Sequence, residues 1–126
     1  LVMILIAAAL VEEAVKSVGI YTLIEKHKTG SVRSILFLSF LSALGFLISE
    51  KLLLLVSISA VSQLSLAGII LNNSELLLAP LAAHFIFTTF VTLLPAKTGL
   101  PYRYSLLLGT AIHVLYNWFL LGGMGI

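Results

Sequence analysis

Three ionisable residues, Glu12, Glu13 and Lys16, lie in the middle of an apolar segment near the start of the chain. Residues 1–11 before them are apolar throughout, and residues 18–24 after them are nearly so. An ionised side chain at the centre of a bilayer costs about 2.5–3.5 kcal/mol even on permissive insertion scales. We therefore interpret these residues as part of a polar site within a membrane-embedded helix.

The composition also favours a membrane protein. Of the 126 residues, 60% are hydrophobic and only 10% are charged, whereas a soluble domain is about 25% charged. The formal net charge of +2 does not indicate a nucleic-acid partner. Cysteine is absent, which excludes disulfides and thiolate chemistry. The lipid bilayer is therefore the expected environment.

Apolar segments divide the chain into membrane crossings of the length that an α-helix needs, about 20 residues. The predicted segments are residues 1–24, 34–71, 76–94 and 102–121. The second would be about 57 Å long as one helix, which exceeds a hydrocarbon core of about 30 Å. It should therefore tilt, or bend or break near Ser57–Ser65. The predicted fold is an all-α polytopic transmembrane bundle, a single domain over residues 1–126, with a four-helix core and four or five segments.

The basic residues predict an orientation in the membrane. They gather in the first loop and around the loop at residues 95–101, and they are Lys26, Lys28, Arg33, Lys97 and Arg103. The turn at residues 72–75 has none. By the positive-inside rule both basic loops face the cytoplasm, and the cytoplasmic membrane is the expected location. A five-crossing chain would instead place Lys97 and Arg103 outside.

Four polar residues interrupt the four segments at a similar depth, about 16–26 Å from the basic loops at about 1.5 Å per residue. They are Glu12, Glu50, His84 and His113. Each has a companion four positions away on the same helix face, namely Lys16, Phe46, Thr88 and Asn117. We expect Glu12 and Lys16 to form an ion pair. Glu13 lies on another face of the helix and needs a different partner, such as a histidine or water.

These residue types suit the hydrolysis of a peptide bond without a covalent nucleophile. A buried carboxylate can act as a general base for water. A histidine N–H or the Asn117 amide can stabilise an oxyanion. The alternative is a zinc site formed from Glu13, Glu50, His84 and His113, with the remaining glutamate as base. The HExxH spacing typical of zinc proteases is absent.

The order of the motifs resembles a known family, the PrsW-type intramembrane proteases, within the superfamily of CAAX prenyl endopeptidases and bacteriocin-immunity ABI proteins. The matching motifs are Glu12-Glu13-x-x-Lys16, Phe46-x-x-x-Glu50, His84-x-x-x-Thr88 and His113-x-x-x-Asn117. The resemblance implies that Glu12 and Glu13 are the paired catalytic glutamates and that one activates water. It also implies that His113 and Asn117 position water or bind the oxyanion. The supporting or substrate-facing residues are then Lys16, Phe46, Glu50, His84 and Thr88.

The sequence thus predicts an intramembrane endopeptidase, a hydrolase that acts on a membrane-anchored protein or peptide. Which glutamate is the base stays open, as does the choice between metal-free and zinc-dependent water activation. A homo-oligomer or a partner membrane subunit is also open. Two other functions use the same cluster: a proton or cation transporter, and a non-catalytic scaffold of a membrane complex.

Overall fold

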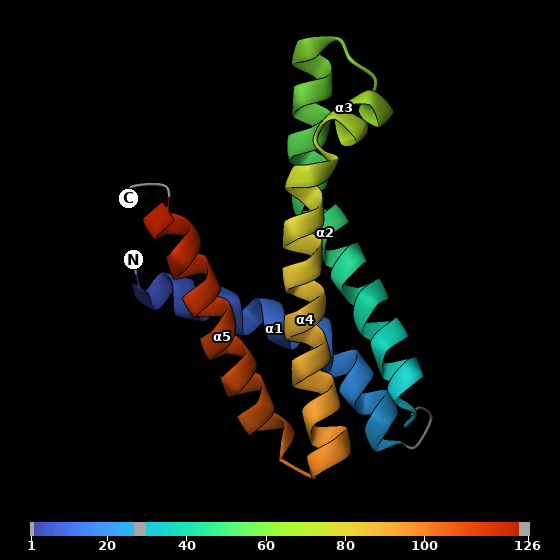
Figure 1. Cartoon of the computed structure of the whole chain (residues 1–126), viewed down its shortest axis with the longest axis vertical. Coiled ribbons are helices and arrows are strands. Elements are labelled where there is room, and N and C mark those ends of the chain that lie inside the picture. The colour runs from blue at the N-terminus through green and yellow to red at the C-terminus, as the bar shows by residue number, and fades with distance from the viewer. Residues whose placement is uncertain (1, 27–29, 124–126) are drawn as a thin grey trace.

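The computed structural model describes residues 2–26 and 30–123, apart from the side chains at positions 53, 75, 76 and 121. These residues form helices joined by short connections, which confirms the predicted all-α fold (Figure 1). The helices are α1 (Val2–Glu25), α2 (Val32–Ser62), α3 (Leu66–Asn72), α4 (Ser74–Thr98) and α5 (Tyr102–Gly123). Lys28, one of the residues used to predict orientation, lies outside the described residues.

Helix α1 determines where the site can form, because it crosses the other long helices at a slant (Figure 1, blue). It packs against α2, α4 and α5, and α4 also packs against α2 and α5. The C-terminal half of α2 and the short α3 extend beyond the end of α5 at the top of the view. The middle of α1 is therefore enclosed by three other helices.

Two helical stretches are long and apolar enough to cross a membrane, Val32–Leu52 in α2 and Leu77–Thr98 in α4. A bent pair, Leu54–Ser62 with Leu66–Asn72, brings the number to three among the described residues if the pair is one span. Many large apolar side chains also face outward. The chain is accordingly a membrane protein. The predicted spans at residues 1–24 and 102–121 correspond to α1 and α5, whose apolar runs are interrupted by polar residues.

The long second segment breaks inside its serine-rich stretch. Helix α2 ends at Ser62, Gln63 adopts a left-handed conformation with φ of 60°, and the chain bends by 108° before α3. Serine side chains bind the backbone groups that the break leaves free. The Ser65 hydroxyl accepts a hydrogen bond from the Gly68 N–H at 3.1 Å, and the Ser59 hydroxyl donates to the Leu64 carbonyl at 2.6 Å.

Helix α4 runs further than the predicted segment at residues 76–94. We expected Pro95 to end it, but the helix continues to Thr98. That prediction was wrong because a proline removes one backbone hydrogen bond and does not always stop a helix. The helix ends instead at Gly99, which has a φ of +71° and donates its N–H to the Pro95 carbonyl at 3.1 Å. A left-handed glycine is a common helix terminus.

Helices α4 and α5 approach closely where Gly109 faces Val91. A Cβ atom on Gly109 would overlap the Val91 Cγ2 atom, and Val91 is fully buried. Small residues let membrane helices pack at short distance. This contact brings the following turn of α5, which carries His113, against α1 and α4.

Candidate functional site

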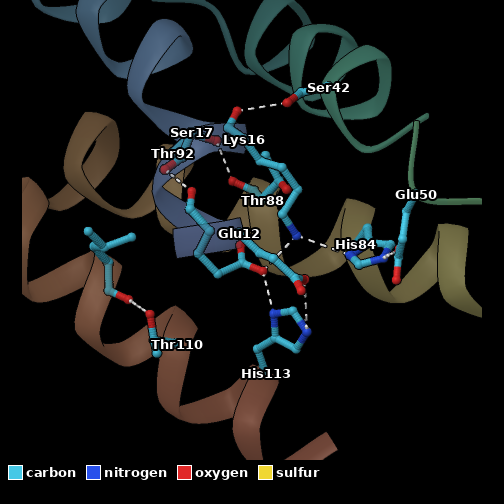
Figure 2. Close-up of polar contacts among 12 residues, drawn as sticks. Glu12, Lys16, Ser17, Ser42, Glu50, His84, Thr88, Thr92, Thr110 and His113 are labelled. Atoms are coloured by element: carbon cyan, nitrogen blue, oxygen red, sulfur yellow. Dashed lines mark hydrogen bonds and ion pairs between the residues drawn. The ribbon is translucent and has the colours of Figure 1, made fainter. Parts of the chain in front are cut away.

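The Glu13 carboxylate lies at the centre of the site and is fully buried. Its Oε1 atom is 2.6 Å from Lys16 Nζ and 2.7 Å from His113 Nδ1. Lys16 Nζ is also 3.1 Å from His84 Nδ1 (Figure 2). One buried carboxylate and one buried ammonium therefore connect three helices, α1, α4 and α5.

The ion pair on α1 differs from the expected one. We expected Lys16 to pair with Glu12, but it pairs with Glu13, three positions before it. Both spacings bring side chains together on a helix, so the pair is decided by which glutamate faces the interior. Of the two partners considered for Glu13, a histidine and water, the structure shows a histidine, His113. The Glu12 side chain is 28% exposed, and its Oε2 lies 3.6 Å from His113 Nε2.

The hydrogen bonds assign opposite roles to the two imidazoles. A lysine ammonium only donates, so His84 Nδ1 accepts from Lys16, and neutral His84 carries its proton on Nε2. An ionised carboxylate only accepts, so His113 donates its Nδ1–H to Glu13. Neutral His113 then has an unprotonated Nε2, which is the nitrogen that faces Glu12. His84 thus offers a donor and His113 an acceptor.

A cavity of about 170 Å³ lies beside these groups. Its polar and titratable lining residues are Glu12, Glu50, Lys51, His84, His113, Tyr116 and Asn117. A water molecule needs about 30 Å³ and two or more polar partners, so the cavity can hold several waters. It gathers carboxylates, imidazoles and one amide around a space of the right size for water.

The remaining predicted residues surround His84. The Phe46 ring meets the His84 imidazole edge-on at 5.4 Å and lies 5.3 Å from Lys16 Nζ. Glu50 Oε2 is 3.6 Å from His84 Nε2. Thr88 is fully buried, and its hydroxyl has no hydrogen-bond partner among the described residues. Every residue of the predicted site therefore lies in the network, along the cavity, against the His84 ring (Phe46), or one helical turn from His84 (Thr88).

Several residues that support the site were missed in the sequence. The Ser17 hydroxyl donates to the Glu13 carbonyl at 2.5 Å, so the Tyr102 hydroxyl donates to Ser17 at 2.6 Å. The Ser42 hydroxyl donates to the Lys16 carbonyl at 2.7 Å. The spacing could have indicated the role of Ser17, because Ser17 is four positions after Glu13 and lies on the same helix face. These bonds fix the section of α1 that carries the ionised residues.

The zinc alternative does not fit this arrangement. Among the residues that the structure describes, no three histidine or carboxylate side chains are placed to hold one metal ion. The proposed zinc ligands were Glu13, Glu50, His84 and His113. In Glu13, Oε1 accepts from the Lys16 ammonium and from the His113 N–H, and Oε2 is buried without a hydrogen-bond partner among the described residues. Glu13 is thus held by the Lys16 ammonium and the His113 ring, and it is not one of a group of three residues placed around a metal ion.

The fold and the site define an all-helical membrane protein whose interior holds a network of glutamate, lysine and histidine. The chain matches none of the protein-family models, curated proteins or solved structures with which it was compared.

Proposed function

We propose that the chain is an intramembrane endopeptidase that hydrolyses a peptide bond of a membrane-anchored protein or peptide with glutamate-activated water. One observation carries this proposal: Glu12 and His113, whose Oε2 and Nε2 atoms are 3.6 Å apart, line the same cavity, which has room for several waters, inside an apolar bundle. The resemblance of the four ordered motifs to PrsW-type proteases supports the same reaction.

In this mechanism Glu12 is the general base. It takes a proton from a cavity water while the water oxygen attacks the peptide carbonyl carbon. The Nε2–H of His84 and the amide of Asn117 can donate to the oxyanion that forms. Glu12 then passes the proton to the leaving amine as the C–N bond breaks. The products are a new carboxyl terminus and a new amino terminus, and the atoms of one water are consumed.

Glu13 acts as a positioning residue in this scheme. It is fully buried, it is not among the residues that line the cavity, and its Oε1 is bound by Lys16 and His113, so it has no direct access to a cavity water. By accepting the Nδ1–H of His113 it fixes the ring and leaves Nε2 unprotonated toward the water. The choice of Glu12 rather than Glu13 as base rests on this difference in burial.

We also propose that α1 and α5 cross the membrane with α2 and α4, as a multi-pass protein of the cytoplasmic membrane. The Glu13–Lys16 pair supports a crossing by α1, because paired charges cost less in a bilayer than isolated ones. The end of α1, the start of α2 and the α4–α5 turn lie together at the bottom of Figure 1. The basic residues Lys26, Arg33, Lys97 and Arg103 belong to these parts of the chain, as a shared cytoplasmic face requires.

A second candidate function, proton or cation transport, is favoured by the continuity of the network. Successive contacts of 3.6, 2.7, 2.6, 3.1 and 3.6 Å link Glu12, His113, Glu13, Lys16, His84 and Glu50. Chains of titratable groups within a membrane are typical of proton pathways.

One experiment distinguishes the two functions. Purified protein in proteoliposomes is given a panel of membrane-anchored reporter peptides, and an internal dye records pH. A protease yields new peptide termini whether or not a pH gradient is imposed, and a chelator leaves the rate unchanged. Proton flux without cleavage, or neither activity from a folded protein, would contradict the proposal.

A further inference from the structure

The polar cavity beside the charged network extends toward one end of the bundle. We define the basic end of the bundle as the end of α1, the start of α2 and the turn between α4 and α5 (Figure 1). On α5 the cavity is lined from His113 to Leu120, and on α4 from Phe87 back to Pro80. At about 1.5 Å per residue it therefore extends about 10 Å along each of these helices, away from the basic end.

The exposure of the lining side chains shows where the cavity opens. At its inner limit, His113 is 3% exposed. At the limit away from the basic end, the Glu50 side chain is 42% exposed and Leu120 is 50% exposed. An ionised side chain that faces lipid is costly, so Glu50 and the neighbouring Lys51 favour a mouth that is filled with water.

On the other side of the cavity, toward the basic end, contacts join the four long helices into a closed ring, which we call the contact ring. Helix α1 is joined to α2, α2 to α4, α4 to α5, and α5 back to α1. The four contacts are Ser42 to the Lys16 carbonyl at 2.7 Å (Figure 2), Ser39 to Thr92 at 3.0 Å, Gly109 against Val91, and Tyr102 to Ser17 at 2.6 Å.

The contact ring leaves little room for water. Most of its side chains are fully buried, and so are its neighbours Ile35, Thr88 and Ser105. A separate cavity of about 440 Å³ lies at the basic end and shares no lining residue with the polar cavity. Tyr21, which lines this separate cavity, stacks on Tyr102 of the contact ring. The two cavities are therefore separated by packed side chains.

We propose that water and water-soluble molecules enter the polar cavity only from the side away from the basic end, and that the contact ring closes the other side. By the positive-inside rule, the open side faces away from the cytoplasm. The water that the proposed hydrolysis consumes then comes from that side, a consequence that rests on the proposed function. The access path itself rests only on burial and on contacts between helices. Proton transport through the network would require the contact ring to open.

Cysteine labelling of the full chain in sealed membrane vesicles tests this access path. The chain contains no cysteine, so one introduced thiol is the only site for a thiol reagent. Asn117→Cys and Ala83→Cys place the thiol in the cavity, on α5 and on α4. Ser105→Cys places it in the buried part of α5 nearer the basic end, where the serine hydroxyl has no hydrogen-bond partner among the described residues. Ser74→Cys and Thr98→Cys, exposed at the two ends of α4, mark the two sides of the membrane.

The reagent is a cationic, membrane-impermeant methanethiosulfonate, added to right-side-out or to inside-out vesicles. We expect it to label both cavity thiols only from the side that labels Ser74→Cys, because a thiol reacts as the thiolate and buried thiols are inert. Ser105→Cys should react only after denaturation. If Asn117→Cys does not fold, Ala83→Cys decides alone.

Labelling of the cavity thiols from the Thr98→Cys side, or from neither side, would overturn the proposal. Labelling of Ser105→Cys in the folded protein would also overturn it, as would labelling of both α4 markers from one side. The assay needs no substrate. A protein that shows one-sided labelling but cleaves no reporter would therefore contradict the proposed function and support the access path.

Discussion

Glu13 and Lys16 form a buried ion pair with a contact of 2.6 Å between Oε1 and Nζ. Their side chains are 0% and 1% exposed. Each charge is compensated while its partner is present. Removing one partner leaves an uncompensated buried charge, which destabilises the fold. The pair also holds His84 and His113, one through each partner.

Changing either partner alone should therefore destabilise the fold strongly. We expect Glu13→Gln or Lys16→Met to lower the free energy of unfolding by about 3–5 kcal/mol. The double variant should lose clearly less free energy of unfolding than the two single variants together, because no unpaired charge remains. Titration with a denaturing detergent, followed by circular dichroism, measures this.

The matched control is Glu50→Gln, whose side chain is 42% exposed and whose ion pair with Lys51 is long, at 3.8 Å. This substitution should lower the free energy of unfolding by less than about 1 kcal/mol. Losses that add up in the double variant would show that the two residues are not coupled.

The close approach of α4 and α5 makes a second prediction. Gly109→Ala places a Cβ atom where Val91 Cγ2 lies, so it should destabilise the fold by about 1–3 kcal/mol. Val91→Ala in the same chain should recover most of that loss. Gly45→Ala is the control, because no atom lies within 4 Å of its added Cβ. Equal losses of stability in the two glycine variants would contradict the close packing of α5 on α4 at Gly109.

Much of this architecture follows from the sequence. Apolar segments predicted the helices. The second segment, residues 34–71, was too long for one straight crossing, which predicted a tilt, a bend or a break near residues 57–65, and α2 ends there at Ser62. Similar depth predicted one shared level for Glu12, Glu50, His84 and His113, and all four line the same cavity. Distance along a helix axis depends on helical rise, which is uniform, so positions far apart in the chain can be compared. The slant of α1 relative to the other long helices also enters its depth.

The orientation of α1 about its own axis did not follow from the sequence. Lys16 can reach Glu12 or Glu13 from its own helix, and packing against α2, α4 and α5 decides which one is enclosed. The same packing gives Ser17 and Tyr102 their roles. The end of α4 was missed for a local reason, because Pro95 is a weaker stop than Gly99.

Tyr102 supplies a third prediction, as the outermost member of the chain of bonds to Glu13. Tyr102→Phe keeps the stacking on Tyr21, whose ring lies 4.4 Å away, and removes only the hydrogen bond to Ser17. The expected loss of stability is about 0.5–1.5 kcal/mol. Tyr104→Phe, at a position 47% exposed, should change little. An equal effect of the two variants would contradict the assigned role of Tyr102.

The two histidines should be opposite tautomers. In ¹⁵N-labelled protein near neutral pH, we expect neutral His84 to carry its proton on Nε2 and neutral His113 on Nδ1. Long-range ¹H–¹⁵N correlation spectra distinguish the two forms, and His84→Gln assigns the signals. The same tautomer at both positions would contradict the roles of donor and acceptor assigned at the cavity.

The most direct test of the central claim is cleavage of a membrane-anchored reporter by wild type, Glu12→Gln and Glu25→Gln. The two variants carry the same substitution on the same helix, and Glu25 is exposed at its end. Because Glu12 is the proposed base, Glu12→Gln should lower the rate by about 10²–10⁴-fold with its folding intact, and Glu25→Gln should cleave as wild type does. Cleavage by Glu12→Gln at the wild-type rate would contradict the account.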